Sequence, residues 1–213
     1  MSVEDNLKSV RERIERAGRN PDEIAIVAVT KGYGPAVCQA GLDAGLKILG
    51  ENRVQEALGK MDAVKGAEWH LIGHLQTNKV KLAAGRFALI QSVDSRHLAD
   101  ALARINVEQK VLVEVNVARE PRKTGVDPAG APELLDAVAE MLDLQGLMAM
   151  GPAEGDPRPA FDELRTIRDE AQQRLGKALP ILSMGMSGDF EVAVKAGSTM
   201  VRLGTVLFGP RPR

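Results

Sequence analysis

The sequence has few residues of the kinds that mark secreted, membrane-bound or nucleic-acid-binding proteins. Its 213 residues include a single cysteine, Cys38, which excludes an internal disulfide and favours a reducing, cytoplasmic compartment. Aromatic residues make up 3% of the chain, so the stacking surfaces that single-stranded nucleic acids require are nearly absent. The N-terminus lacks an apolar signal-peptide core, and no hydrophobic run approaches the length of a membrane span.

The charges of the sequence are nearly balanced. Lys and Arg number 28 and Asp and Glu number 29, a formal net charge of −1, so no basic field attracts nucleic acid. Hydrophobic residues make up 44% of the chain, which is enough for one large core at this length. We therefore expect one soluble, cytoplasmic domain over residues 1–213, with neither nucleic acid nor membrane as a partner.

Short apolar runs rich in β-branched residues alternate with amphipathic segments along the chain. The runs predict strands at 24–30, 47–50, 68–73, 87–93, 110–117, 144–150, 179–184 and 199–203. The segments between them predict helices at 36–44, 54–64, 79–84, 95–104, 131–142, 160–175 and 190–196. An extra N-terminal helix is predicted because Val3, Leu7, Val10 and Ile14 recur at helical spacing.

This alternation of strands and helices predicts an α/β fold with parallel strands joined by right-handed crossovers. Eight strands close a barrel of this kind, so we predict a (β/α)8 TIM barrel; a doubly wound open sheet, which usually has fewer strands, is the alternative. In such barrels the chemistry lies at the carboxyl ends of the strands. The polar stretch 118–130 after the fifth strand is a candidate lid or, alternatively, a mobile surface loop.

Polar residues follow most of the predicted strands at their carboxyl ends. Lys31 ends the first run, and taken alone it is interpreted as a strand-end lysine that reaches into water; the alternative is a desolvated amine that can attack a carbonyl to form a Schiff base. The other strand-end residues are Glu51, Asn52, Gly73, His74, Ser92, Asp94, Asn116, 148–150, Ser183 and Arg202. This convergence indicates a site better than any one of the residues does.

Two glycine-bearing turns after the last two strands are candidate phosphate sites. In the first, at 183–189, Ser187 is predicted to cap the next helix and to leave free amides facing the rim. The second is 202–205, in the loop position that often binds phosphate in barrels. Gly185 and Gly204 would let the backbone approach an anion closely. An ordinary N-cap and an ordinary turn are the alternatives.

The sequence gives little support to metal or triad chemistry. His70, His74 and Cys38 lack the spacing of metal ligands, and no G-x-S-x-G motif occurs. His74 is interpreted as a rim or packing histidine. Core, pocket or loop-packing roles are expected for Met148, Met150, Met184, Met186, Tyr33 and Phe208.

Motifs along nearly the whole chain, in this order, resemble the pyridoxal 5'-phosphate (PLP) homeostasis protein family. They are VAVTK (27–31), GENRVQE (50–56), WHLIGHLQTNK (69–79), VEVN (113–116), Gly125, GLM (146–148), LSMGMSGD (182–189) and VRLGTVLFG (201–209). The resemblance implies the barrel of the alanine racemase N-terminal domain, in agreement with the strand count. The sequence departs from the family at Tyr33-Gly34 and in a shorter loop around 151–159.

The resemblance implies that PLP is the cofactor, held as an internal aldimine on Lys31. Arg202 would lie near the pyridine nitrogen, where a permanent charge disfavours protonation and makes the ring a poorer electron sink. The other implied cofactor-binding residues are Asn52 and His74 in the pocket, Ser183 and Met184 in its wall, and Ser187, Gly204 and Thr205 at the phosphate. No catalytic residue and no metal ligand is implied.

Three functions follow from these observations. The resemblance implies intracellular PLP homeostasis, by binding, storage or delivery to apo PLP-dependent enzymes, without established turnover. A PLP-dependent amino-acid racemase is the alternative, but related racemases take a second base, a tyrosine, from a β-domain of the partner subunit. The sequence leaves no room for such a domain after Gly209. A Schiff-base aldolase acting on a phosphosugar is the third class.

Two further expectations concern partners. Because the second domain of the racemases is lacking, a monomer is expected. The basic residues Arg119, Arg122 and Lys123 are expected to be solvated loop charges, and no secondary PLP site is assigned to them.

Overall fold

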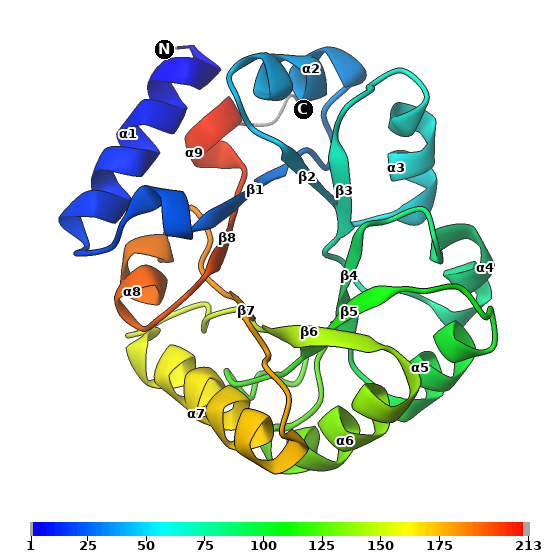
Figure 1. The fold of residues 1–213 in the computed structure, drawn as a ribbon. Helices are drawn as coiled ribbons and strands as arrows, with labels where there is room; N and C mark the ends of the chain where they lie inside the picture. Colours follow the sequence, from blue (N-terminus) through cyan, green and yellow to red (C-terminus); the bar gives the residue numbers. More distant parts are fainter. Residues whose placement is uncertain (1, 211–213) are drawn as a thin grey trace.

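A closed barrel of eight parallel strands forms the centre of the molecule, and helices surround it (Figure 1). The computed structural model describes residues 2–210. The strands are β1 (Ala25–Val29), β2 (Ile48–Glu51), β3 (Glu68–Leu71), β4 (Leu89–Val93), β5 (Lys110–Glu114), β6 (Asp143–Met148), β7 (Ile181–Ser183) and β8 (Met200–Leu203). Each strand pairs with its neighbour in the chain, and β8 pairs with β1. The predicted TIM barrel is confirmed, and the closing pair excludes the open sheet.

The predicted helices all appear, with shifts of a few residues at their ends. They are α1 (Val3–Arg16), α2 (Pro35–Asp43), α3 (Val54–Met61), α4 (Val80–Ala83), α5 (Arg96–Ala103), α6 (Ala131–Met141), α7 (Arg158–Leu175) and α8 (Phe190–Lys195). Short 3-10 turns lie at Pro21–Glu23, Thr77–Lys79 and Pro128–Gly130. A further helix, α9 (Thr205–Phe208), was not predicted, because four residues are too few to show helical periodicity.

Local sequence signals explain several helix ends. The Ser2 hydroxyl accepts a hydrogen bond from the Asp5 N–H, and the Asp5 carboxylate accepts one from the Ser2 N–H, so α1 begins with a capping box. Ser95 caps α5 by accepting from the Leu98 N–H at 3.3 Å. Gly45, after α2, has φ +93°, the left-handed conformation that ends a helix without steric cost to glycine.

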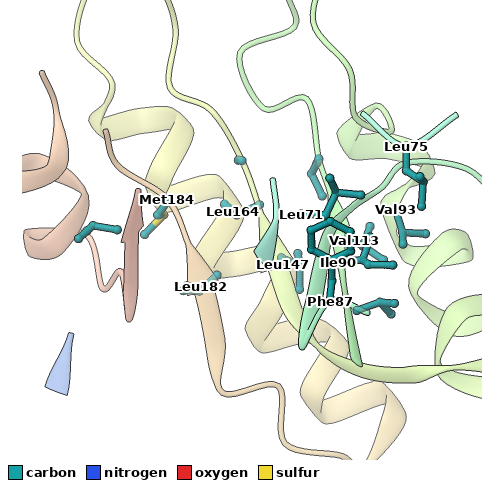
Figure 2. Packing of buried hydrophobic residues seen from close by; sticks show 14 of the residues in the cluster. Leu71, Leu75, Phe87, Ile90, Val93, Val113, Leu147, Leu164, Leu182 and Met184 are labelled. Carbon is teal, nitrogen blue, oxygen red and sulfur yellow. The ribbon is translucent and has the colours of Figure 1, made fainter. Parts of the chain in front are cut away.

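Apolar residues pack in two layers, one on each side of the strands. Between the barrel wall and the helices, Leu71, Ile90, Val113 and Leu147 of successive strands lie together, with Leu164 of α7 in the same cluster (Figure 2). The second layer fills the barrel interior and consists of Val27, Leu89, Leu112, Met148 and Met200. Polar side chains of the strands, among them Gln91 and Ser183, are also buried.

The methionines that were expected in the core or a pocket differ in burial. Met148 and Met184 are buried and Met150 is half-buried. Met186 is 39% exposed and lines a surface hollow together with Met150, so it is a pocket residue and not a core residue.

Helix α1 and the C-terminal segment pack together on the outside of the barrel, near the pair β1 and β8. Helix α1 lies against α9 (Figure 1). The Asn6 side chain donates to the Leu207 carbonyl oxygen at 2.8 Å. The Tyr33 hydroxyl donates to the Gly209 carbonyl oxygen at 2.8 Å, and its ring packs on Phe208 with centroids 5.6 Å apart. The loop and packing roles predicted for Tyr33 and Phe208 are confirmed.

The loop after β5 is tied to its neighbours by charged side chains. Arg119 forms two hydrogen bonds with Glu163 of α7, each 2.7 Å long. Lys123 donates to the Gly151 carbonyl oxygen and to Glu120, both at 2.8 Å. These basic residues therefore anchor the loop by ion pairs.

No helix among residues 2–210 combines the length and the apolar character that crossing a membrane requires.

Candidate functional site

Lys31 and Arg202 come to the same mouth of the barrel from adjacent strands. Val27 belongs to the interior cluster, and because side chains alternate along a strand, Val29 continues its inward-facing row; Lys31 lies in the turn that follows the strand. On β8, Met200 belongs to the same cluster and Arg202 follows it. The register pairs Val27 with Arg202. The half-buried Lys31 thus stands beyond Arg202 at the carboxyl ends of the strands.

The guanidinium of Arg202 is held by backbone and side-chain acceptors. It is 4% exposed; Nη1 donates to the carbonyl oxygen and hydroxyl of Ser183, at 2.7 and 2.9 Å, and Nη2 donates to the Ala149 carbonyl oxygen at 2.8 Å. Burial lowers the pKa of Arg202 to about 10, although Glu114 and Asp189 oppose this shift. The group therefore stays charged at neutral pH and presents a fixed cation to the mouth.

A chain of hydrogen bonds leads from Arg202 through the barrel. The Ser183 hydroxyl donates to Gln91 Oε1 at 2.6 Å, and Gln91 Nε2 donates to His70 Nδ1 at 3.0 Å. His70 Nε2 lies 2.9 Å from Glu68 Oε1, at the start of β3. Burial lowers the pKa of His70 although Glu68 opposes the shift, so we assign a neutral ring with its proton on Nε2.

Ser187, in the first candidate phosphate turn, lies beside the start of α9. Its hydroxyl accepts a hydrogen bond from the Val206 N–H at 3.4 Å. The prediction that Ser187 caps α8 is wrong, because the chain makes one more turn and Asp189 is the N-cap residue. The Asp189 carboxylate accepts from the Met186 N–H at 2.6 Å and closes that turn.

The two glycines of the candidate phosphate turns differ in what they contact. A Cβ on Gly185, whose φ is +98°, would lie 2.9 Å from Phe190 Cα, so packing against α8 requires glycine there. Gly204 precedes Thr205 at the start of α9, and its Cβ would lie 3.5 Å from Val29, an ordinary contact. Gly204 and Thr205 therefore lie next to the inward row that leads to Lys31.

Asn52 and His74 line a hollow of about 380 Å³ on the rim. A Cβ on Gly73 would lie 2.5 Å from the Asn52 carbonyl oxygen, so glycine allows the ends of β2 and β3 to approach closely. His74 Nδ1 lies 3.1 Å from Asp94 Oδ2, and the His74 side chain is 48% exposed. The hollow also includes the cationic side chains Arg53 and Lys79.

Glu114, the last residue of β5, has a role at the mouth that the sequence analysis missed. It is 2% exposed; Oε1 accepts from the Thr124 hydroxyl at 2.7 Å, whereas the buried Oε2 has no hydrogen-bond partner among residues 2–210. Burial raises the pKa of Glu114, and Asp94 adds to the shift, while Arg202 and His74 oppose it. An unpaired buried oxygen of this kind marks a place for a ligand group or water.

The sequence analysis also missed a buried ionic cluster formed by Glu51, Glu56 and Lys60. Lys60 is 6% exposed, and its Nζ lies 2.8 Å from Glu51 Oε1 and 2.8 Å from Glu56 Oε1. The available signal was the spacing of four residues between Glu56 and Lys60 on one helix, which places the two side chains next to each other.

Other predicted strand-end residues have structural partners. The Ser92 hydroxyl donates to the Gly73 carbonyl oxygen at 2.7 Å, and the Asn116 amide donates to the Glu120 carbonyl oxygen at 3.0 Å. Met184 belongs to the cluster between the barrel and the helices, so its side chain faces away from the interior. Only its backbone can contribute to a pocket wall.

Comparisons with known proteins extend over the whole chain. The family model described as "Alanine racemase, N-terminal domain" matches residues 2–212. The pyridoxal phosphate homeostasis protein of Aquifex aeolicus (strain VF5) is 45% identical over 226 residues, covering 99% of both chains. The protein of the same name from Escherichia coli (strain K12) is 37% identical over 232 residues, covering 97% of this chain and 95% of its own.

Solved structures show the same architecture. PipY of Synechococcus elongatus PCC7942 without PLP is 34% identical, with a TM-score of 0.87 over 98% of this chain and 100% of its own. The structure of PipY with PLP bound is 33% identical, with a TM-score of 0.85 over the same shares. Alanine racemase of Clostridium difficile 630 with cycloserine is 16% identical, with a TM-score of 0.77 over 98% of this chain and 60% of its own. At that identity the likeness concerns the fold alone.

Proposed function

We propose, from the premise that this chain belongs to the alanine racemase N-terminal domain family, that it binds pyridoxal 5'-phosphate for intracellular homeostasis. The observation that carries the proposal is that Lys31 follows β1 at the carboxyl end of the barrel, and that the adjacent strand β8 carries the buried Arg202 cation. The names of the relatives and the PLP-bound structure of PipY support it.

The donor set at the mouth fits the chemical groups of PLP. PLP supplies an aldehyde, which the Lys31 amine would hold as a reversible Schiff base with loss of water. The Ser187 hydroxyl and the N–H groups of Gly204 and Thr205 would donate to the phosphate. Arg202 would lie at the pyridine nitrogen, held there by Ser183. The rest of the proposed pocket consists of Asn52, His74 and the backbone of Met184.

Holding and passing on the cofactor, without turnover, is the role we propose. A fixed cation at the pyridine nitrogen disfavours protonation of the ring and weakens it as an electron sink. The relatives at 45% and 37% identity carry names that describe homeostasis. The racemase alternative has the support of fold likeness at 16% identity, which does not extend to activity.

Borohydride trapping tests the attachment of PLP. The visible spectrum is recorded with PLP before and after reduction for the wild type, Lys31→Ala and Lys47→Ala; Lys47 is an exposed lysine just before β2, at the opposite end of the barrel. We expect a Schiff-base band and a reduced adduct, mapped to Lys31, in the wild type and in Lys47→Ala only. Identical PLP binding by Lys31→Ala would show that Lys31 is not the anchor.

Delivery and turnover are tested separately. Loaded protein is mixed with an apo PLP-dependent enzyme, and recovery of that enzyme's activity measures transfer. Exchange of the α-proton of alanine in deuterated water measures racemase-type chemistry, and exchange at enzymic rates would contradict the homeostasis proposal.

We also propose that the protein is cytoplasmic and a monomer. For a monomer, sedimentation should give the mass of a single chain.

A further inference from the structure

We propose that Glu51, Glu56 and Lys60 form a clamp that fixes the backbone on both sides of Lys31 and thereby positions its amine. The inference rests on the proposed role of Lys31 as the anchor for PLP. It assigns a positioning role to three charged residues that lie outside the proposed pocket, and the clamp is defined as these three side chains.

The clamp holds the peptide group before Lys31 through Thr30. Lys60 Nζ donates to the Thr30 carbonyl oxygen at 2.8 Å, and the Thr30 hydroxyl donates to Glu51 Oε1 at 2.6 Å. Thr30 and Glu51 are fully buried. The carbonyl and the side chain of Thr30 are therefore both bound to the same ion pair, which leaves this residue little freedom to move.

The clamp holds the peptide group after Lys31 through Gly32. The Gly32 N–H donates to Glu56 Oε1 at 2.5 Å, and the same oxygen accepts from Lys60 Nζ at 2.8 Å. Gly32 has φ +77°, a left-handed conformation that turns the chain sharply after Lys31. One ammonium group thus connects the residues on both sides of Lys31.

The clamp lies behind the barrel wall, on the side of the helices. Ala28 and Leu49 belong to the cluster between barrel and helices, and alternation places Thr30 and Glu51 on the same outward rows. Lys31 and Asn52 follow these outward-facing residues in the chain. The clamp therefore binds the strand ends from the side of α3, where Glu56 and Lys60 lie.

The electrostatics of the clamp favour a positioning role over a purely stabilising one. Burial alone would lower the pKa of Lys60, but hydrogen bonds to Glu51 and Glu56 outweigh it and raise the pKa. Burial raises the pKa of Glu51, although Lys60 and Thr30 oppose this shift. Desolvation of a buried ion pair offsets most of its attraction, so apolar residues would stabilise the fold as well. The three charged groups hold two peptide groups in place, which apolar residues cannot do.

Glu56 variants test the clamp with little risk to folding, because its side chain is 28% exposed, whereas truncating Glu51 or Lys60 leaves a buried charge unpaired. Glu56→Ala removes the acceptor for Gly32, Glu56→Gln keeps a neutral acceptor, and Glu56→Asp keeps the charge on a shorter chain. Asp136→Ala is the control, since it removes an exposed ion pair with Arg174 on α6 and α7.

Two measurements are made on each variant. Hydrogen exchange of the Gly32 amide is followed by NMR in protein without PLP, and PLP affinity is measured by absorbance titration. We expect Glu56→Ala and Glu56→Asp to speed Gly32 exchange and to weaken PLP binding, each about tenfold, the effect of losing one charge-assisted hydrogen bond. We expect Glu56→Gln to stay within about threefold of the wild type, and Asp136→Ala to match it.

The outcomes separate this inference from the proposed function. If the wild type forms no adduct on Lys31, the proposed function fails, and the Gly32 exchange still reports on the clamp. If the wild type binds PLP and both Glu56→Ala and Glu56→Asp match it in exchange and affinity, the clamp is overturned. A change in only one of the two measurements also overturns it, because the clamp requires backbone order and affinity to change together. Glu56→Asp decides the question if Glu56→Ala does not fold.

Discussion

At the scale of residues, Arg202 owes its position to the forked shape of the guanidinium. Two nitrogens reach acceptors on Ser183 and Ala149, which come from neighbouring strand ends. A lysine has one nitrogen and cannot reach both. We expect Arg202→Lys to lower the free energy of unfolding by about 2–4 kcal/mol in urea titrations. Lys47→Arg, an exposed control, should change it by less than about 0.5 kcal/mol, and an equal effect of both would contradict this account.

Glu114 provides a pH-dependent prediction at the same scale. Burial raises its pKa in the folded protein, so the folded state binds its proton more tightly than the unfolded state does. The contribution is present below the unfolded pKa and is lost as pH rises through the folded pKa. We expect Glu114→Gln to gain stability over the wild type with rising pH, by at most about 1.4 kcal/mol per pH unit within that window. Urea titrations of protein without PLP between pH 4 and 8 measure this difference, and a constant difference would contradict it.

At the scale of elements, Gly146 allows β6 and β7 to pair. It has φ +154°, and a Cβ there would collide with the Ile181 carbonyl oxygen. We expect Gly146→Ala to cost about 2–4 kcal/mol of stability through backbone strain and overpacking. Gly59→Ala is the matched control: Gly59 lies in α3 with nothing within 4 Å of its Cβ, and we expect a gain of about 0.5–1 kcal/mol. Thermal unfolding of both variants checks the opposite signs.

Elements that were long enough to show a period could be predicted from the sequence, and the others could not. The apolar runs identified all eight strands, because a strand covered on both faces is apolar throughout. Helix α9 has four residues and no period. The cap of α8 was assigned to Ser187 instead of Asp189, because both residue types cap helices and only the path of the turn distinguishes them.

At the scale of the whole molecule, Gln91 connects the two ends of the barrel. Its amide joins Ser183, which holds Arg202 at the mouth, to His70, which contacts Glu68 at the opposite end. We expect Gln91→Leu to lower the unfolding free energy by about 2–4 kcal/mol, because it leaves buried polar groups without partners. Gln145→Leu loses one local bond to Asp143 and should cost less than about 1 kcal/mol. Equal losses in urea titrations would contradict the role of the chain.

The sequence by itself determined the barrel, the order of its elements, and the strand ends at which Lys31, Ser183 and Arg202 lie. These follow from periodicity and from the rule that parallel strands place their carboxyl ends at one rim. Only the tertiary structure decided which side chains contact each other there. Residues from different strands and helices are joined by the clamp around Lys31 and by the bonds of Arg202. The burial of the unpaired Glu114 oxygen likewise depends on the folded chain. Apart from the spacing of Glu56 and Lys60 on one helix, a linear pattern carries no information on these contacts, because closure of the barrel and burial create them.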